Sequence, residues 1–566
     1  MSQVADNGGA ALVDALRELG VEIAFGLPGV HNLAVWEAAA DAGIRLVGVR
    51  HEQAAVYAAD GYARATGRLG VAVVTTGPGA ANTLGATGEA MTAGAPVLVV
   101  ATDIPSTLRR PGVYRGVLHE TRDQGAMFAP ITKSTTTTAS ADELYADTIA
   151  AGRAALAAPT GPVYLGVPTD LLSAAVTERA PAAAPQADDR EPDLDAALAL
   201  IARAERPLLW VGGGALRAGA GDAVGRLAER LAAPVVTTYL GRGVLPPDHP
   251  CLVPGPAHVP AIGALWDEAD LVISVGSDLD GMTTQNWRMP QPPALLAINV
   301  DAADAAKNYA CDHVLVGDAQ AVTARLADAV PERDGLADLT ARIAVLGGHV
   351  AALVQEEEPQ AAQLLDVLGR VVPDDAVVLT DMCIAGYWVA GFHRVPGPRR
   401  LAYPMGWGTL GYAFPAALGA AVAGQGRAVG QGRAVGQGRA VGQGRAVAIV
   451  GDGGFLFACG ELATAAQERL PLTVVLVDDG GYGMLRFDQV HAGVPTRGVD
   501  LATPDFATLA GAFGVTAHSV DGFGEAFEAA LVKSLDDDGP NLIAVRAGLT
   551  PPPSTSPRWY RAREGV

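Results

Sequence analysis

Short valine-rich apolar runs alternate with alanine-rich segments of helical pattern along most of the 566-residue chain. A strand that is apolar at every position is buried on both faces, as in a parallel sheet covered by helices on both sides. The pattern therefore predicts an α/β fold with several doubly wound, Rossmann-like parallel sheets. The clearest runs are residues 71–75, 96–100, 207–211, 271–275, 447–450 and 472–477.

Two changes of composition divide the chain. Residues 180–195 are rich in Pro, Ala and Asp and carry no apolar periodicity, which is typical of a linker. A less distinct break near residues 328–336 is followed by a long helical pattern and an acidic stretch. We expect three α/β domains at residues 1–178, 190–335 and 360–550, with a proline-rich tail at 551–566.

Residues 424–447 are four perfect tandem copies of Gly-Gln-Gly-Arg-Ala-Val. A period of six is also found in solenoids, but four copies inside an α/β domain favour a glycine-rich loop between a helix and the strand at Val447. We expect this segment to be an exposed insertion without a function of its own.

Composition disfavours several classes of partner. Acidic residues outnumber basic ones by 61 to 40, and the formal charge of −21 would repel nucleic acid and anionic lipid. The N-terminus has no basic segment before an apolar core, and the apolar runs are of strand length, so neither export nor a membrane span is predicted. The cysteines form no Cys-x-x-Cys pair and suit a reducing cytoplasm; they are Cys251, Cys311, Cys383 and Cys459.

A phosphate site is predicted where an apolar strand ends at Val450. The glycine-rich turn at residues 451–454 lets the backbone approach a ligand, and a helix expected from about Leu456 would direct its free N–H groups there. Asp452 in the turn and Asp479 after the next strand are oxygen ligands suited to Mg²⁺ beside a diphosphate. The alternative is an ordinary turn with surface acids.

The same stretch, with Gly-Asp-Gly at 451–453, Asp478-Asp479 and Gly-Gly-Tyr-Gly at 480–483, resembles thiamine-diphosphate enzymes. The branch it is most similar to contains acetolactate synthase, benzoylformate decarboxylase and benzaldehyde lyase. The resemblance implies that Mg²⁺ is held by Asp452, Asp479 and the backbone carbonyl of Gly481, and that Gly453, Gly454 and Tyr482 line the diphosphate. The family usually has two asparagines at 478 and 479, so the aspartates add negative charge beside the diphosphate.

Three further cofactor residues follow from the resemblance. Glu52, in the sequence Arg-His-Glu, would read alone as a solvated acid at a helix start; in the family it hydrogen-bonds the aminopyrimidine and activates the cofactor. Residues 75–83 resemble the glycine-rich turn of the same pyrimidine-binding domain. Leu410 aligns with the residue that holds the cofactor in its bent conformation, although it could also be a core residue. Gly408 aligns with the residue whose backbone carbonyl accepts a hydrogen bond from the cofactor's amino group.

Two histidines are expected on the substrate side. His31 aligns with a histidine of benzaldehyde lyase, and His119 occupies a position where acetolactate synthases usually have glutamine. Such a pair could carry protons to and from the reacting oxygen. A structural role is the alternative for each.

The middle segment resembles the family's central domain, which binds FAD in some members. Those acetolactate synthases usually carry an arginine after the strand that here reads Val275-Gly-Ser-Asp278. Its absence disfavours FAD.

The resemblance covers residues 10–550 and implies a homodimer or homotetramer, with each active site between the first domain of one subunit and the last domain of another. The implied reaction is decarboxylation of a 2-oxo acid. The remaining group is then either transferred to a carbonyl acceptor or protonated. Acetolactate-synthase-like chemistry on pyruvate is the leading version. A benzaldehyde-lyase-like carboligase and a decarboxylase of a larger 2-oxo acid remain open, as does a non-catalytic cofactor-binding paralogue, which the retention of Glu52 disfavours.

Overall fold

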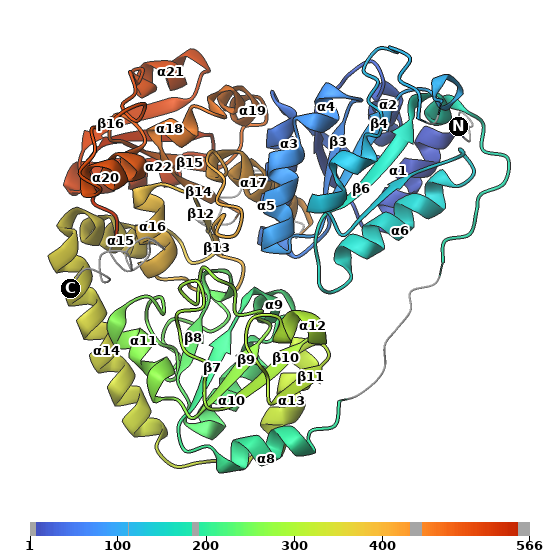
Figure 1. Ribbon diagram of the computed structural model, residues 1–566. Helices are drawn as coiled ribbons and strands as arrows, with labels where there is room; N and C mark the ends of the chain where they lie inside the picture. Colours follow the sequence, from blue (N-terminus) through green and yellow to red (C-terminus); the bar gives the residue numbers. More distant parts are fainter. Residues whose placement is uncertain (1–6, 111, 184–191, 431–443, 553–566) are drawn as a thin grey trace.

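The computed structural model describes residues 7–110, 112–183, 192–430 and 444–552. Three parallel sheets flanked by helices lie in three units, with the N-terminal (blue) and C-terminal (red) units above the central one (green) in Figure 1. The predicted α/β class with doubly wound parallel sheets is confirmed.

The N-terminal sheet has six strands in the order β2-β1-β3-β4-β6-β5, and every neighbouring pair is parallel. All residues of β4 are buried, as the apolar run predicts. The strands are β1 Ile23–Gly26, β2 Arg45–Gly48, β3 Gly70–Val74, β4 Val97–Asp103, β5 Ser134–Thr137 and β6 Val163–Pro168. The helices are α1 Gly8–Glu18, α2 Leu33–Asp41, α3 Glu52–Thr66, α4 Pro78–Ala81, α5 Leu84–Ala93, α6 Leu144–Leu156 and α7 Thr169–Ser173.

The central sheet has five parallel strands in the order β11-β10-β9-β7-β8. These are β7 Pro207–Val211, β8 Val235–Thr237, β9 Leu271–Val275, β10 Leu295–Asn299 and β11 His313–Val316. The helices are α8 Asp195–Arg203, α9 Gly213–Arg217, α10 Gly221–Leu231, α11 Pro260–Glu268, α12 Ala302–Ala306 and α13 Ala319–Ala329. The glycine turns after β7 and β9 pack on each other, and the Gly214 amide donates to the Gly276 carbonyl (2.9 Å).

A long helix, α14 (Leu336–Glu357), connects the central unit to α15 (Pro359–Val371) and runs along one edge of the molecule (yellow in Figure 1). Ile343, Leu346, Val350 and Val354 form a buried stripe at helical spacing that packs into the core between the two units. Within the described residues, α14 alone has the length and hydropathy of a membrane-crossing helix, a weak signal that core helices also produce.

The C-terminal sheet has the order β13-β12-β14-β15-β17-β16. Its strands are β12 Val377–Thr380, β13 Leu401–Ala402, β14 Ala446–Gly451, β15 Leu472–Asp478, β16 Thr516–Asp521 and β17 Asn541–Arg546. Its helices are α16 Ile384–Phe392, α17 Ala413–Gly430, α18 Asp452–Phe455, α19 Leu462–Gln467, α20 Gly483–His491, α21 Phe506–Ala512 and α22 Glu525–Asp536.

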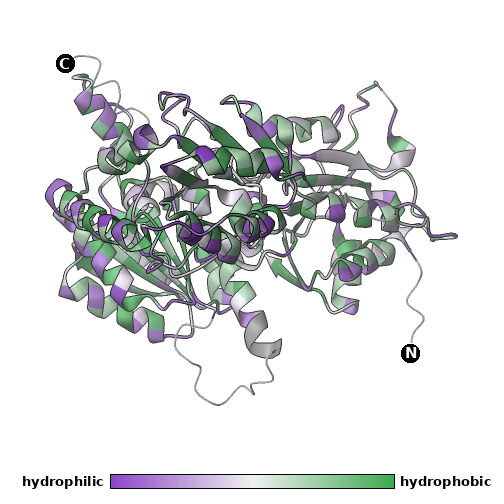
Figure 2. Cartoon of the chain, turned by 90° about the horizontal axis from the view of Figure 1, so that it is seen from below, coloured by the Kyte–Doolittle hydropathy of each residue, from purple (hydrophilic) through white to green (hydrophobic). Residues whose placement is uncertain are grey.

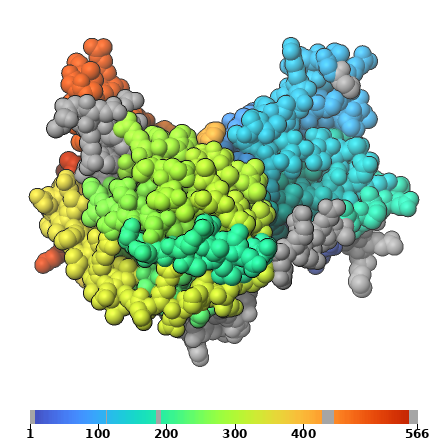
Figure 3. Space-filling view, turned by 60° about the horizontal axis from the view of Figure 1, so that its bottom comes forward, coloured from blue at the N-terminus to red at the C-terminus, as the bar shows by residue number. Residues whose placement is uncertain are grey.

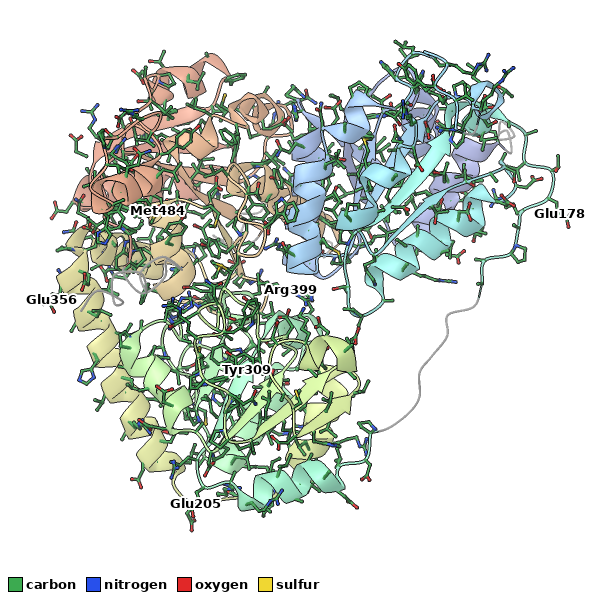
Figure 4. The ribbon with its side chains drawn as sticks, in the orientation of Figure 1. Glu178, Glu205, Tyr309, Glu356, Arg399 and Met484 are labelled. Atoms are coloured by element: carbon green, nitrogen blue, oxygen red, sulfur yellow. The ribbon has the colours of Figure 1, made fainter. Side chains whose placement is uncertain are left out.

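The N- and C-terminal units meet where α3 packs against α17. A Cβ at Gly61 would lie 2.0 Å from the Ala416 carbonyl oxygen, and one at Gly419 would lie 1.8 Å from that of Ala58, so only glycine permits this approach of the two backbones. Arg399, labelled at the junction of the three units in Figure 4, donates to the carbonyls of Arg64 (3.4 Å) and Arg217 (3.2 Å).

Apolar residues concentrate on the strands inside each unit and polar residues on the outer helix faces (Figure 2). The space-filling view shows the central unit in front, with the other two rising on either side of a notch (Figure 3).

The repeat is described only at its two ends. Helix α17 extends into the first copy and β14 begins at Ala446, with Gly424 packed against Gly444. The expected loop falls largely on residues 431–443, which lie outside the described residues.

Candidate active site

The turn after β14 brings Asp452 to the carboxyl edge of the C-terminal sheet. Gly451 of β14 pairs with Val477 of β15, so Asp452 and Asp479 follow two neighbouring strand ends. The helix predicted from about Leu456 is wrong. The four-residue α18 begins at Asp452 itself, and the longer α19 begins at Leu462, because a 3₁₀ turn at Cys459–Glu461 interrupts the helical path.

Asp452 is buried and Asp479 is half-buried, and both carboxylates are incompletely paired. Asp452 is 1% exposed, and its Oδ1 accepts the Gly453 amide (2.7 Å). Among the described residues, Asp452 Oδ2 and Asp479 Oδ1 have no hydrogen-bond partner. Burial, and then the charge of Asp479, raise the pKa of Asp452 to about 7; burial also raises the pKa of Asp479, opposed by Arg486. Such acids are suited to receive a cation.

A cavity of about 220 Å³ lies against these carboxylates, and all of its walls come from residues 382–549. The sequence-predicted residues of the C-terminal half of the site all line it: Gly408, Leu410, Asp452, Gly453, Gly454, Asp479, Gly481 and Tyr482. A Cβ at Gly453 would lie 2.6 Å from the Tyr482 ring, so this turn has room only for glycine.

The donor set fits Mg²⁺ together with a diphosphate. No group of three or more His, Cys, Asp or Glu side chains able to hold a metal occurs in the described part of the chain. Mg²⁺ commonly takes one or two carboxylates and completes its octahedron with phosphate oxygens, waters or carbonyls. Asp452 and Asp479 supply the two carboxylates, and the Gly481 carbonyl and a diphosphate can supply further oxygens.

Asp381 is a functional residue that the sequence reasoning missed. It is fully buried after β12 and accepts the amides of Gly411 (3.0 and 3.1 Å) and Tyr412 (3.4 Å), which fixes the segment that carries Gly408 and Leu410. Burial raises its pKa to about 6. The sequence does contain one signal for Asp381: like Asp452, it directly follows an apolar strand of the same sheet.

Glu52 is the first residue of α3 and is 8% exposed, so it is not a solvated helix-start acid. Its Oε2 accepts the Asn82 side-chain amide (2.9 Å) in the turn that follows α4. Glu52 is not part of the wall of the cofactor cavity. The chain thus carries two half-sites, one in each outer domain.

A second missed residue, Glu461, connects the two outer domains. Its Oε1 accepts the amides of Arg50 (2.8 Å) and His51 (3.0 Å), directly before Glu52, and its Oε2 accepts the Thr464 hydroxyl (2.6 Å). Burial raises the pKa of Glu461. Nothing in its sequence context distinguishes this acid from others at helix starts, because its partners lie some 410 residues away.

His31 and His119 lie side by side, with ring centroids 5.3 Å apart in an edge arrangement. His31 Nδ1 is 2.7 Å from the Thr76 hydroxyl, and burial followed by the charge of His119 lowers the pKa of His31. His119 has a left-handed backbone (φ +67°), and its buried Nδ1 has no partner within the described residues. The structure therefore brings the two predicted histidines together at the glycine-rich turn of the N-terminal domain.

Gln124, which sequence reasoning also missed, supports this turn. Its Oε1 accepts the Gly77 amide (2.7 Å), and its Nε2 donates to the Tyr164 hydroxyl (2.8 Å) and to the Thr102 carbonyl (2.9 Å).

Three family models match the chain. They are "Thiamine pyrophosphate enzyme, N-terminal TPP binding domain" at residues 6–127, the central domain of the same enzymes at 194–326, and their "C-terminal TPP binding domain" at 381–545. The first range contains Glu52 and both histidines, and the third contains the cofactor cavity's carboxylates.

Two relatives are similar over nearly the full chain. "Probable 2-ketoarginine decarboxylase AruI" of Pseudomonas aeruginosa is 35% identical over 95% of this chain and 93% of that protein. "Acetolactate synthase" of Mycobacterium bovis is 32% identical over 90% of this chain and 82% of that protein. A solved thiamine diphosphate-dependent 4-hydroxybenzoylformate decarboxylase of Rhodococcus jostii RHA1 shares the fold, with a TM-score of 0.75, 23% identity, and coverage of 96% of this chain and 99% of that chain.

Proposed function

This chain belongs to the thiamine pyrophosphate enzyme family, and from that premise we propose a thiamine diphosphate- and Mg²⁺-dependent 2-oxo acid decarboxylase and carboligase. The observation that carries the proposal is the pair of carboxylates, Asp452 and Asp479, each with a buried oxygen that has no partner within the described residues, on a cavity inside the matched C-terminal TPP-binding region. FAD has no part in it.

Each residue of the C-terminal half-site has an assigned task. Asp452, Asp479 and the Gly481 carbonyl hold the metal, while Gly453, Gly454 and Tyr482 surround the diphosphate. The bound cofactor supplies a carbon nucleophile and an electron sink for the loss of CO₂. Asp381 keeps the Gly408–Leu410 segment in place against the cofactor's central part.

Glu52, a buried carboxylate, would exchange a proton with the aminopyrimidine when the cofactor is bound. Glu461 is a positioning residue for Glu52. It accepts the two backbone amides directly before Glu52 and so fixes the position of the first residue of α3.

The site is completed by a second copy of the chain, in a homodimer or homotetramer. Among the described residues, those that line the cofactor cavity all come from 382–549, and a second subunit would bring Glu52 and the histidines of its N-terminal domain to it. Large apolar side chains are exposed near both half-sites, as expected of an interface that forms on assembly. They include Val30 (84% exposed) and Leu118 (70%) near the histidines, and Leu485 (44%) and Val490 (64%) on α20.

His31 and His119 carry protons on the substrate side. The lowered pKa of His31 keeps its imidazole neutral near pH 7, so that it can accept a proton and return it. The leading version of the reaction is acetolactate-synthase-like, with pyruvate as donor and a carbonyl compound as acceptor. We place it in the cytoplasm, where the free cysteines stay reduced.

A second candidate is a decarboxylase of a larger 2-oxo acid. The paired histidines favour it, because simple decarboxylation ends when a proton is added to the group left after loss of CO₂, and the histidines can deliver that proton. Carboligation requires a second carbonyl compound at the same point. The 35% identity to a protein named as a 2-ketoarginine decarboxylase points the same way.

Product analysis tests the proposal. The purified protein is incubated with thiamine diphosphate, Mg²⁺ and a panel of 2-oxo acids, each with and without an aldehyde, and products are identified by mass spectrometry. Acetolactate from pyruvate supports the leading version, and an aldehyde from a larger 2-oxo acid supports the second candidate. Cofactor binding with neither release of CO₂ from any of these acids nor coupling of the aldehyde would instead identify a non-catalytic paralogue.

A further inference from the structure

A second cavity, of about 700 Å³, lies between the central and C-terminal units. Its walls come from residues 242–255 after β8, from α14 and α15, and from the end of α16. Glu356, labelled on α14 in Figure 4, follows the wall residue Gln355. The cavity shares no lining residue with the cofactor cavity, and its size is within the range of small-molecule sites at domain interfaces.

One end of this cavity is basic. Arg242 donates to the carbonyls of Ala390 and His393 (2.5 Å) at the C-terminal end of α16, where the helix dipole favours a cation. Burial lowers the pKa of Arg242 to about 10, and the only group that opposes this is Tyr239. The guanidinium charge is therefore balanced by backbone carbonyls and by no carboxylate of the described chain.

His393 stands beside this cation. It is 4% exposed and lines the cavity, and within the described residues its Nδ1 has no hydrogen-bond partner. Burial, with the charges of Arg242 and Arg394, lowers the pKa of His393 to about 3, so the ring is neutral. A buried imidazole nitrogen without a partner, next to a guanidinium that no carboxylate of the described chain pairs with, is an arrangement that an anion would complete.

Apolar side chains form one part of the interior, with Leu245, Val253, Val350, Leu365 and Phe392 among them, and Thr237, Gln355 and Arg394 also line the cavity. The lining acids Asp248 and Asp366 are exposed, and Asp366 is paired with Arg370 (2.9 Å). Negative charge is thus confined to solvated side chains.

We propose that this cavity binds a small carboxylate that carries an apolar chain. The carboxylate lies against Arg242 and His393, and the chain lies against the apolar walls. Helix α16 connects the two cavities, because Ile384 at its start lines the cofactor cavity and Phe392 at its end lines this one.

Isothermal titration calorimetry of the cofactor-loaded protein with hexanoate and with 1-hexanol tests the proposal. The expected result is saturable binding of one hexanoate per chain, with 1-hexanol at least about 10-fold weaker because it lacks the charge-assisted hydrogen bonds. Equal affinity for the two probes, or no binding of hexanoate, would overturn it.

Matched variants locate the binding. Val350→Phe fills the cavity from α14, whereas Val345→Phe makes the same change on an exposed face of that helix (58% exposed). Hexanoate binding should be lost in the first and retained in the second. His393→Leu, which leaves Arg242 in place, should weaken hexanoate about 10-fold and leave 1-hexanol unchanged. Unaltered hexanoate binding in Val350→Phe would place the ligand elsewhere and contradict the proposal.

Discussion

The N- and C-terminal domains have the same strand order, since β2-β1-β3-β4-β6-β5 corresponds strand for strand to β13-β12-β14-β15-β17-β16. In each sheet, the loop after the third strand in sequence and the start of the long helix after the second strand contribute to the half-site. After β3 this loop reads Thr-Thr-Gly-Pro-Gly at residues 75–79, and after β14 it reads Gly-Asp-Gly-Gly at 451–454. The sheet thus supplies a place for a ligand, and the loop residues decide which chemistry occurs there.

The two half-sites also differ in which polar atoms are left without a partner. In the N-terminal half, Glu52 is bonded to Asn82 and His31 to Thr76, while His119 Nδ1 and the Thr75 hydroxyl are unpaired within the described residues. In the C-terminal half the unpaired atoms are carboxylate oxygens of Asp452 and Asp479. We therefore expect the first half to serve proton transfer and the second to be completed by a cation.

The largest expected effect separates turnover from cofactor binding. Glu52→Gln removes the carboxylate of the N-terminal half-site and should lower kcat by about 10²- to 10⁴-fold, the usual contribution of a general acid–base. Thiamine diphosphate affinity, measured by calorimetry, should stay within a few-fold of the native value, since the residues proposed to hold the metal and the diphosphate, among them Asp452 and Asp479, are unchanged. Activity retained in this variant would refute the assignment of the activating base.

Asp452→Ala should give the converse result. Loss of a metal ligand is expected to weaken Mg²⁺-dependent cofactor binding on the order of 100-fold, and saturating Mg²⁺ and cofactor should restore part of the activity. Calorimetric titrations of cofactor at several Mg²⁺ concentrations measure this. The Glu52→Gln and Asp452→Ala variants are controls for each other. If both lost cofactor binding, the assignment of proton transfer and cofactor binding to different half-sites would be wrong.

Glu461 tests whether the domains are coupled through the start of α3. Glu461→Ala removes the acceptor of two amides and should lower kcat about 10-fold, in keeping with hydrogen bonds to a charged group. The KM of the 2-oxo acid and the cofactor affinity should change little. Glu461→Gln keeps an acceptor oxygen and should recover most of the loss; an equal defect in both variants would point to a general loss of folding instead.

The histidine pair gives a smaller effect, visible in the pH profile. The charge of His119 lowers the pKa of His31, so His119→Gln should raise that pKa towards its ordinary value. If neutral His31 is the active form, kcat/KM declines as pH falls through its pKa. This acid limb should move to higher pH in the variant, and rates measured between about pH 5 and 8 test it. An unmoved limb would mean that another group controls it.

The smallest effect concerns the residue in which this chain departs from its family. Asp479→Asn removes one negative charge beside the diphosphate and should tighten cofactor binding by about 2- to 5-fold, as expected for one charge in a partly exposed site. A loss of affinity by an order of magnitude would show that the carboxylate itself is the preferred metal ligand here. Calorimetry at fixed Mg²⁺ distinguishes the two results.

Local patterns were sufficient for the strands and the turn. The apolar runs at residues 207–211 and 271–275 coincide with β7 and β9, because complete burial of a strand is recorded in its own residues. The Gly-Asp-Gly turn likewise predicted Asp452 at a strand end. The helix expected from Leu456 was misplaced, because nothing local distinguishes an unbroken helix from one interrupted by a 3₁₀ turn.

By itself, the sequence determined the α/β class and the family, and it predicts which residue types would bind metal and diphosphate, since each of these depends on short segments of chain. Only the tertiary structure decided that His31 lies beside His119, that Asp381 holds Gly411, and that Glu461 holds the amides before Glu52. It also decided that burial raises the pKa of Asp452 to about 7. These are contacts between residues far apart in the chain, and they follow from how the domains pack, which no local pattern records.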